Sequence, residues 1–327
     1  MTAVATRAEP ERGRIALARG AVRGTSSNVL LTKKSAAEKR TDLRAALKSG
    51  RLLRFPGAFS PLVAMVIERQ GFEGVYISGA ALSADLGLPD IGLTTLDEVA
   101  ARGTAIARMT GLPSIIDADT GFGEALNVSR TVQTLEAAGL CGCHFEDQQN
   151  PKRCGHLDGK TLVPAEDMVR KIRAAVRARR DDAFVIIART DARASEGLEG
   201  AIARARAYVD AGADMIFPEA LADEGEFEQF RKAVSVPLLA NMTEFGKSKL
   251  LTTKQLTELG INVVIYPVTT LRLAMKAVEE GLAVIQKDGT QEPLLGRMQT
   301  RAELYELLRY QDYAQFDQDI YNFKPPQ

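Results

Sequence analysis

The sequence predicts an α/β protein built as a (β/α)8 barrel of the TIM type. From residue 51 to about residue 290, short apolar runs that end in a polar or charged residue alternate with helical stretches rich in Ala, Leu, Arg and Glu. Strands and helices that alternate in this way form a parallel sheet covered on both faces. Eight such units fit the roughly 250 residues that a barrel of this kind needs.

The predicted strands and helices follow one another in order. Several helices end in a glycine just before the next strand, at Gly71, Gly139, Gly212 and Gly260, which is the residue that favours a helix stop. We predict strands at 52–55, 74–78, 113–117, 140–146, 184–190, 214–219, 236–241 and 262–266, and helices at 60–70, 95–110, 127–138, 165–179, 198–211, 223–233, 253–259 and 269–286. An open doubly wound sheet is the alternative, but no predicted strand is followed by a Gly-x-Gly-x-x-Gly turn.

The two ends of the chain differ from its middle. Residues 1–34 are basic, rich in Ala, Thr and Ser, and lack a sustained apolar face. A short helix is expected at 35–50, because Ser35 and Glu38 can form a capping box and Gly50 can end the helix. We therefore predict three parts: an N-terminal extension that is flexible or contacts a partner (1–45), a catalytic barrel (46–290), and a helical tail suited to packing on another subunit (291–327).

Composition excludes several classes of protein. Lys and Arg together number 42, as do Asp and Glu, and this balance argues against a general nucleic-acid binder. No run of about 18 apolar residues exists, so a membrane span is not expected. The 3 cysteines are too few for a disulfide scaffold. We expect a cytoplasmic protein, or a protein of the mitochondrial matrix if the basic extension is a transit peptide.

Acidic side chains gather where the predicted strands end, which is where a barrel of this type places its active site. Asp117 and Asp119 are two residues apart, as are His144 and Glu146, so each pair can share one strand face. Carboxylates that converge repel one another unless a cation separates them, and oxygen ligands suit Mg²⁺ or Mn²⁺. The alternative is a network of salt bridges with Arg189 and other bases.

The loop after the fourth predicted strand reads Lys-Arg-Cys-Gly-His at 152–156. Because Cys154 stands next to two cations, Lys152 and Arg153, and near the imidazole of His156, we predict a lowered thiol pKa and a thiol that can cycle with its thiolate. Gly155 permits a tight turn and a close approach of the backbone to a ligand. The alternative is a surface cysteine without a function.

Two further readings concern ligands. A zinc site could combine Cys154 with Cys141, Cys143 and a histidine, although we expect Cys141 and Cys143 to face the outer helices. His144, on a strand, could instead be a core residue. Separately, Arg189, Arg272 and Arg301 are candidates for binding substrate carboxylates through paired donors.

Taken together, six motifs resemble the isocitrate lyase/phosphoenolpyruvate mutase superfamily over residues 45–315. They are Asp-Ala-Asp-Thr-Gly-Phe-Gly (117–123), His-Phe-Glu-Asp-Gln (144–148), Lys-Arg-Cys-Gly-His (152–156), Ala-Arg-Thr-Asp-Ala (188–192), Phe-Pro-Glu-Ala (217–220) and Ala-Asn-Met-Thr-Glu-Phe-Gly (240–246). The last two are most similar to the 2-methylisocitrate lyases of that superfamily. The resemblance implies a barrel in a homotetramer that exchanges C-terminal helices between subunits. It also implies a tricarboxylate substrate and the Mg²⁺-assisted cleavage of 2-methylisocitrate to pyruvate and succinate in propionate catabolism, the methylcitrate cycle.

The resemblance also implies roles for individual residues. The implied metal ligands are Asp90, Asp117, Asp119 and Glu146. The implied substrate contacts are Ser78, Gly79, Ala80, Gly155, Arg189, Glu219, Asn241, Met242, Thr243, Arg272 and Arg301. Cys154 is the implied general acid, and His156 and Glu219 orient the thiol and the substrate clamp. Tyr76 is our hypothesis for the general base, since a phenol near Mg²⁺ and an arginine can ionise.

One departure from the superfamily pattern bears on the substrate. Ser78-Gly79-Ala80 stands where the superfamily usually has Ser-Gly-Gly, so an added methyl group can alter the pocket. Phe217, Ile265 and Pro267 stand where methylisocitrate lyases make room for the extra methyl group. Isocitrate lyase and oxaloacetate hydrolase are the alternatives within the superfamily. A barrel that only binds a dicarboxylate or a partner is the alternative from another class.

Overall fold

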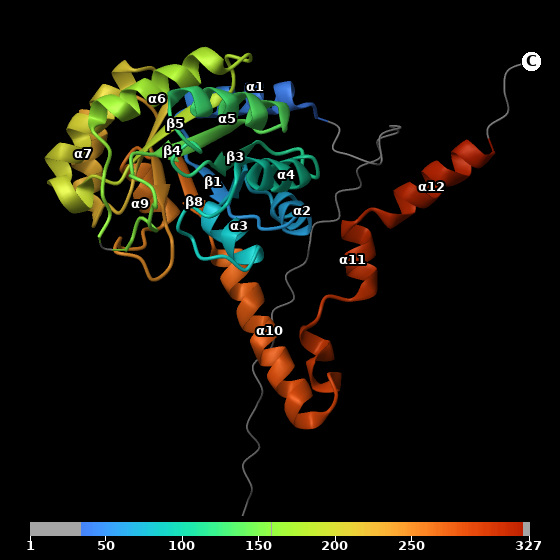
Figure 1. Cartoon of the computed structure of the whole chain (residues 1–327). Helices are drawn as coiled ribbons and strands as arrows, with labels where there is room; N and C mark the ends of the chain where they lie inside the picture. Colours follow the sequence, from blue (N-terminus) through green and yellow to red (C-terminus); the bar gives the residue numbers. More distant parts are fainter. Residues whose placement is uncertain (1–33, 158, 323–327) are drawn as a thin grey trace, which may run out of the picture.

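A ring of parallel strands inside a layer of helices makes up the body of the protein (Figure 1). The computed structural model describes residues 34–157 and 159–322. In these residues the strands are β1 (Leu53–Pro56), β2 (Val75–Ile77), β3 (Ser114–Asp117), β4 (Gly142–Glu146), β5 (Val185–Thr190), β6 (Met215–Pro218), β7 (Leu239–Asn241) and β8 (Val263–Tyr266). Seven of these strands lie within a predicted run, and β1 extends one residue beyond its predicted end.

The strands close into a barrel. Hydrogen bonding gives one sheet in the order β1-β8-β7 and another in the order β2-β3-β4-β5-β6, with every pair parallel. Two parallel bridges, Gly57 to Tyr76 and Ile216 to Leu238, join the two sheets at both of their edges. The predicted (β/α)8 class is therefore confirmed.

The chain forms helices that mostly surround this ring, while the last ones extend away from it (Figure 1). They are α1 (Ala36–Lys48), α2 (Pro61–Arg69), α3 (Gly79–Asp85), α4 (Leu96–Ala107), α5 (Ala125–Ala137), α6 (Ala165–Ala178), α7 (Arg193–Asp210), α8 (Glu224–Ala233), α9 (Thr253–Glu258), α10 (Thr269–Asp288), α11 (Arg301–Leu307) and α12 (Tyr310–Tyr321), with a short 3-10 helix, η1 (Glu292–Arg297). All predicted helical stretches are present. We did not predict α3, whose N-cap is Ser78.

Strand alternation produces two separate hydrophobic cores. The inner core fills the barrel and includes Phe55, Ile115 and Met215, whereas the outer core lies between strands and helices. Cys143 packs in the outer core as predicted. The same prediction is wrong for Cys141, which precedes β4 and packs in the inner core.

Helix α1 closes the end of the barrel opposite α3 (Figure 1). The predicted capping box of Ser35 and Glu38 is present, and Leu43 and Leu47 pack into the inner core. Arg40 also donates to the carbonyl of Leu140 at 2.8 Å, which ties the helix to the barrel. The division that we predicted between residues 45 and 46 therefore falls inside a packed helix. The rest of the predicted extension, residues 1–33, lies outside the described residues.

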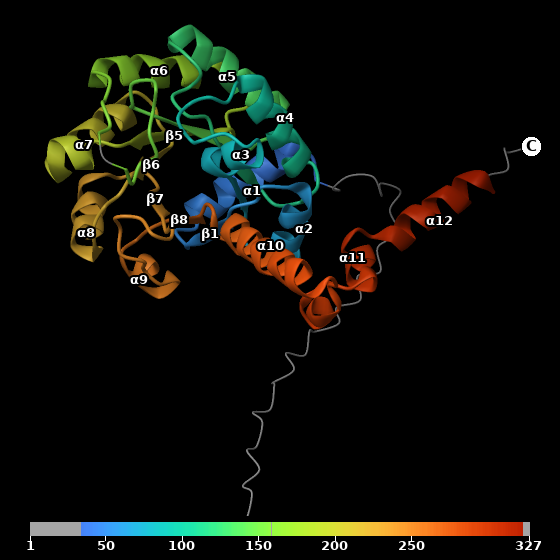
Figure 2. The ribbon, with the colours of Figure 1, turned by 60° about the horizontal axis from the view of Figure 1, so that its bottom comes forward.

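The chain leaves the barrel as an arm made of α10, η1, α11 and α12 (Figure 2). Helix α10 has no buried residue, and its apolar side chains Leu273 and Leu282 are 68% and 61% exposed. The arm thus begins near Thr269, earlier than the predicted division at residue 290. In the described part of the chain, no helix is long and apolar enough to cross a membrane.

Candidate active site

The carboxyl ends of the strands surround one pocket, as expected for a barrel. Its lining comes from almost every strand end, from the loop after β4 and from the start of α10. The lining residues are Tyr76, Ser78, Ala80, Asp90, Asp117, Lys152, Cys154, Gly155, His156, Arg189, Phe217, Glu219, Asn241, Thr243, Pro267, Val268 and Arg272. Most of the predicted site residues are therefore brought together from distant parts of the sequence.

The predicted metal ligands lie around the ammonium group of Lys152. Lys152 Nζ is 2.8 Å from Asp119 Oδ1 and also pairs with Asp90, and its side chain is 3% exposed. Glu146 and Asp117 are close enough to raise the pKa of Lys152 further, against the opposing effect of burial. Among the described residues, no group of three or more His, Cys, Asp or Glu side chains has a geometry that holds a metal ion, zinc included.

The acids nevertheless have the chemistry that a hard cation needs. Both carboxylate oxygens of Glu146 are buried and accept no hydrogen bond, although Arg189 Nε lies 3.2 Å from Glu146 Oε2, and the buried Oδ1 of Asp119 has only the ammonium of Lys152 beside it. Burial raises the pKa of Glu146 and of Asp119. A buried carboxylate without donors is costly, so a divalent cation with oxygen ligands fits these side chains.

Asp117 is held by the backbone around it. Its Oδ1 accepts the main-chain N–H of Asp119 at 3.0 Å, and its Oδ2 accepts that of Gly79 at 3.2 Å. A Cβ atom at Gly79 would lie 2.9 Å from Asp117 Oδ2, so glycine is required for this approach. Asp119 itself has a φ of 48°, a left-handed conformation that turns the chain directly after β3.

Tyr76 and His144 stack in the barrel with their ring centroids 5.8 Å apart. Tyr76 Oη lies 2.8 Å from His144 Nε2. Burial lowers the pKa of His144 to about 4, so the ring is neutral and can accept the phenolic hydrogen. Burial, reinforced by the charge of Asp117, raises the pKa of Tyr76. That direction opposes the easy ionisation on which we based its assignment as a base.

Arg189 is a buried cation that lines the pocket. Its Nε lies 2.9 Å from Asp191, 3.2 Å from Glu146 and 3.9 Å from Glu219, and the side chain is 9% exposed. The guanidinium also packs 5.1 Å from the ring centre of Phe217. Three carboxylates and one aromatic face therefore fix its position before any ligand arrives.

The loop that carries Cys154 lies directly on this centre. A Cβ atom at Gly155 would come within 3.0 Å of Arg189 Nη2 and of Glu219, so only glycine allows the loop to pack here. His156 Nδ1 accepts the main-chain N–H of Lys247 at 2.9 Å. The proton of the neutral ring is then on Nε2, which donates to Glu219 Oε1 at 2.8 Å. His156 thus joins the loop to the segment after β7.

Our prediction of a lowered thiol pKa is wrong. Burial raises the pKa of Cys154, and the N–H of His156 and the charge of Arg189 offset this only in part. The flanking cation Lys152 points to Asp90 and Asp119 instead of the thiol. Cys154 is therefore a protonated thiol at neutral pH, which suits a proton donor better than a nucleophile.

Some predicted contacts lie elsewhere. Asp119 and Glu146 lie beside the pocket, and Gly79 supports Asp117 from behind. Met242 directly follows Asn241, the last residue of β7, so its side chain points to the opposite side, away from the pocket. Its Sδ accepts the N–H of Leu251. Arg301 is the first residue of α11 on the arm, and the structure does not bring it to the pocket of the same chain.

Three residues of the site were not predicted. Lys152 and Asp191 lie inside recognised motifs, so the motifs themselves were the available signal. Lys160 donates to Asp191 Oδ1 at 2.8 Å and to the carbonyl of Gly155. Nothing in its sequence context distinguishes Lys160 from a surface lysine.

Comparison with known proteins agrees with this geometry. Residues 43–286 match the family model described as phosphoenolpyruvate phosphomutase. A Corynebacterium glutamicum protein named probable 2-methylisocitrate lyase 2 is 60% identical over 286 residues, which cover 88% of this chain and 93% of that protein.

Two solved structures share the fold. Oxaloacetate acetylhydrolase in complex with the inhibitor 3,3-difluorooxalacetate is 33% identical with a TM-score of 0.82, and the match covers 89% of this chain and 100% of that one. Phosphonopyruvate hydrolase in complex with oxalate and Mg²⁺ is 35% identical with a TM-score of 0.78, and the match covers 88% of this chain and 99% of that one.

Proposed function

The chain belongs to the phosphoenolpyruvate phosphomutase family, and from this premise we propose that it is a carbon–carbon lyase that cleaves 2-methylisocitrate to pyruvate and succinate. The observation that carries the proposal is the protonated thiol of Cys154, held on a loop that packs against Arg189 and Glu219. A thiol above a cationic, carboxylate-lined pocket suits protonation of a carbanion formed from a polycarboxylate. The relative from C. glutamicum supports the choice of substrate.

The substrate has three carboxylates, and the pocket offers donors for them. Arg189, Arg272, Asn241 and Thr243 line it, as do Ser78 and Ala80 at the end of β2. Phe217 and Pro267 supply apolar surface in the same pocket, which suits the methyl group of the substrate. Ile265, also expected near that methyl group, is fully buried in the inner core beneath them.

Mg²⁺ is the proposed cofactor, with Mn²⁺ as an alternative. Asp90, Asp117, Asp119 and Glu146 would hold it, since the buried oxygens of Glu146 accept no hydrogen bond and Asp90 and Asp119 now pair with the cation of Lys152. When bound, it supplies Lewis-acid stabilisation of developing negative charge on oxygen. The solved complex of phosphonopyruvate hydrolase with oxalate and Mg²⁺ supports this choice.

Cleavage breaks the bond between C2 and C3 of the substrate. The C2 hydroxyl loses its proton and becomes the carbonyl of pyruvate, and the bonding pair passes to C3 of the succinate half. Cys154 then transfers its Sγ proton to C3. Tyr76 is the proposed base, and it would need help from His144 because its own pKa is raised. His156 and Glu219 keep the loop in place and exclude water from the carbanion.

The arm suggests how the subunits assemble. Leu273, Leu282, Leu295 and Ile320 are among its exposed apolar side chains, all at least 60% exposed. We propose that a second copy of this chain covers them, in a homotetramer that exchanges C-terminal helices. Such an exchange would also be the means to bring Arg301 to a neighbouring pocket. The free thiol that the reaction requires suits a reducing compartment such as the cytoplasm.

One assay separates the proposed function from its closest alternative. Pyruvate release is measured with Mg²⁺ from 2-methylisocitrate and from isocitrate, alongside consumption of oxaloacetate. We expect a strong preference for 2-methylisocitrate. Consumption of oxaloacetate without either lyase activity would assign the chain to the activity of its structural relative, oxaloacetate acetylhydrolase, and would overturn the proposal.

A further inference from the structure

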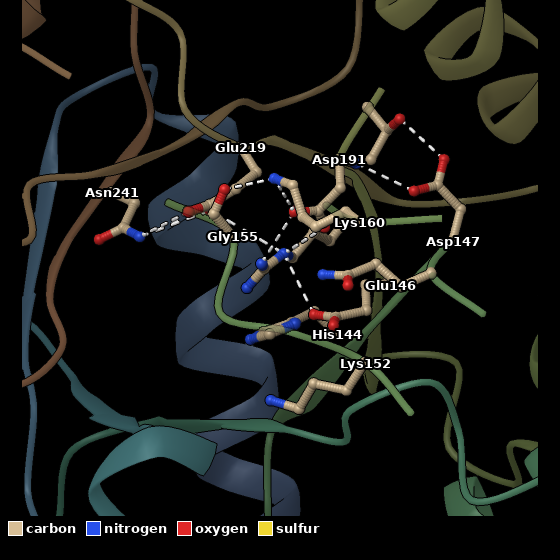
Figure 3. A network of polar contacts seen from close by, with 12 residues as sticks. His144, Glu146, Asp147, Lys152, Gly155, Lys160, Asp191, Glu219 and Asn241 are labelled. Carbon is tan, nitrogen blue, oxygen red and sulfur yellow. Dashed lines mark hydrogen bonds and ion pairs between the residues drawn. The ribbon is translucent and has the colours of Figure 1, made fainter. Parts of the chain in front are cut away.

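Asp191 takes no part in the proposed mechanism, yet its carboxylate contacts two cationic side chains close to the reacting groups. Its Oδ2 accepts a hydrogen bond from Arg189 Nε at 2.9 Å. Its Oδ1 accepts one from Arg189 Nη2 at 3.2 Å and another from Lys160 Nζ at 2.8 Å (Figure 3). One fully buried carboxylate therefore serves both the substrate-binding arginine and a lysine at the far end of the Cys154 loop.

Lys160 links Asp191 to the loop that carries Cys154. Its ammonium also donates to the carbonyl of Gly155, the residue next to Cys154. The Lys160 side chain is 3% exposed, so this charge-assisted contact is shielded from water. Gly155 lies against Arg189 as well, so the loop and the guanidinium share one support.

Asp191 is itself held rigidly. The main-chain N–H of Asp191 donates to Asp147 Oδ1 at 2.9 Å. The other oxygen of Asp147 accepts the hydroxyl of Thr190 at 2.8 Å and that of Tyr208 at 2.7 Å. Asp147 directly follows β4 and Tyr208 lies on α7, so Asp191 is fixed to both of these elements.

We propose that Asp191 is a positioning residue that sets the orientation of Arg189 and, through Lys160, holds the Cys154 loop closed over the pocket. The inference rests on the proposed function for its kinetic part. The two halves of the role are separable. Lys160 acts on the loop alone, whereas Asp191 acts on both the loop and the arginine.

Loop closure can be measured without turnover. The chain contains no tryptophan, so Leu157→Trp, at a loop residue that is 57% exposed, introduces a single fluorophore. In this background we expect Lys160→Met to increase acrylamide quenching of the tryptophan. Lys39→Met is the matched control, because Lys39 is a buried lysine that binds two backbone carbonyls far from the Cys154 loop, those of Ala107 at the end of α4 and Thr110 just after it. It should leave the quenching unchanged.

Steady-state kinetics separates the role of Asp191 toward Arg189 from its role toward the Cys154 loop. Lys160→Met should lower kcat about tenfold or more with little change in KM, because it removes a charge-assisted contact that helps to hold the loop. Lys160→Arg should restore part of that loss. Asp191→Asn should lower kcat and also raise KM, because Arg189 loses its paired acceptor. Should Asp191→Asn fail to fold, Lys160→Met still tests the loop.

The outcomes are distinct. Unchanged quenching in the Lys160→Met variant would overturn the proposed role in loop closure. Equal effects of Lys160→Met and Asp191→Asn on KM would overturn the separate role toward Arg189. If the wild-type chain does not cleave 2-methylisocitrate, the proposed function fails, while the quenching experiment still decides the closure of the loop.

Discussion

Gly155→Ala is the substitution whose effect the structure defines most closely. The new Cβ would come within 3.0 Å of Arg189 Nη2 and of two atoms of Glu219. Both side chains are buried and held by ion pairs, so neither can move aside at low cost. Relief must come from movement of the loop, which takes Cys154 away from the pocket.

The size of the effect follows from that overlap. Overpacking of a well-packed site costs about 1–3 kcal/mol, which lowers the closed population of the loop about 5- to 150-fold. Because proton transfer from Cys154 requires the closed loop, kcat/KM for pyruvate release should fall by a similar factor. The melting temperature should change little, since the loop can open without disturbing the barrel.

The assay is steady-state pyruvate release together with thermal unfolding. Gly296→Ala is the matched control, because a Cβ there meets no atom within 4 Å, and it should behave as wild type. A Gly155→Ala enzyme with kcat/KM within about twofold of wild type would refute the argument that the loop must pack against Arg189 and Glu219.

Four further predictions concern charge and stability. Cys154 must be protonated and burial raises its pKa, so kcat should stay constant through neutral pH and fall only as the pH rises above the ordinary thiol range. A decrease in kcat as the pH is raised from neutral to about 8 would contradict this. Lys152→Met removes the ammonium from Asp119 and its neighbouring acids, so calorimetry should show tighter Mg²⁺ binding, and weaker binding would count against competition for these oxygens. Asp119→Asn should abolish the increase in melting temperature that Mg²⁺ gives, and an unchanged increase would place the metal elsewhere. Tyr208→Phe removes a donor from buried Asp147 and should lower the free energy of unfolding by about 1–3 kcal/mol in urea titrations, whereas no change would show that this bond is replaceable.

The barrel and most of its site could be predicted because both follow from local rules. Parallel strands covered on both faces read as apolar runs, and several runs here end in or near a polar residue at the pocket, as with Asp117, Arg189 and Asn241. The chemistry of the site thus lies at positions that the strand pattern already marks.

The sequence did not reveal in which direction some side chains extend or how deeply they are buried. The position of Lys152 in the loop sequence predicted a cation beside the thiol, but the Lys152 side chain extends to Asp119 instead. Burial is therefore the dominant influence on the pKa of Cys154. Lys160 could not be singled out, since its partner Asp191 is 31 residues away. Arg301 lies on an arm whose path no local pattern specifies.

Cys154→Ser tests the central claim most directly, because it removes the proposed proton donor and keeps the shape of the loop. We expect the variant to fold, to bind Mg²⁺ as wild type does, and to lose pyruvate release from 2-methylisocitrate by about 100-fold or more. A variant that releases pyruvate at close to the wild-type rate would show that the thiol does not supply the proton, and the account of this site would be wrong.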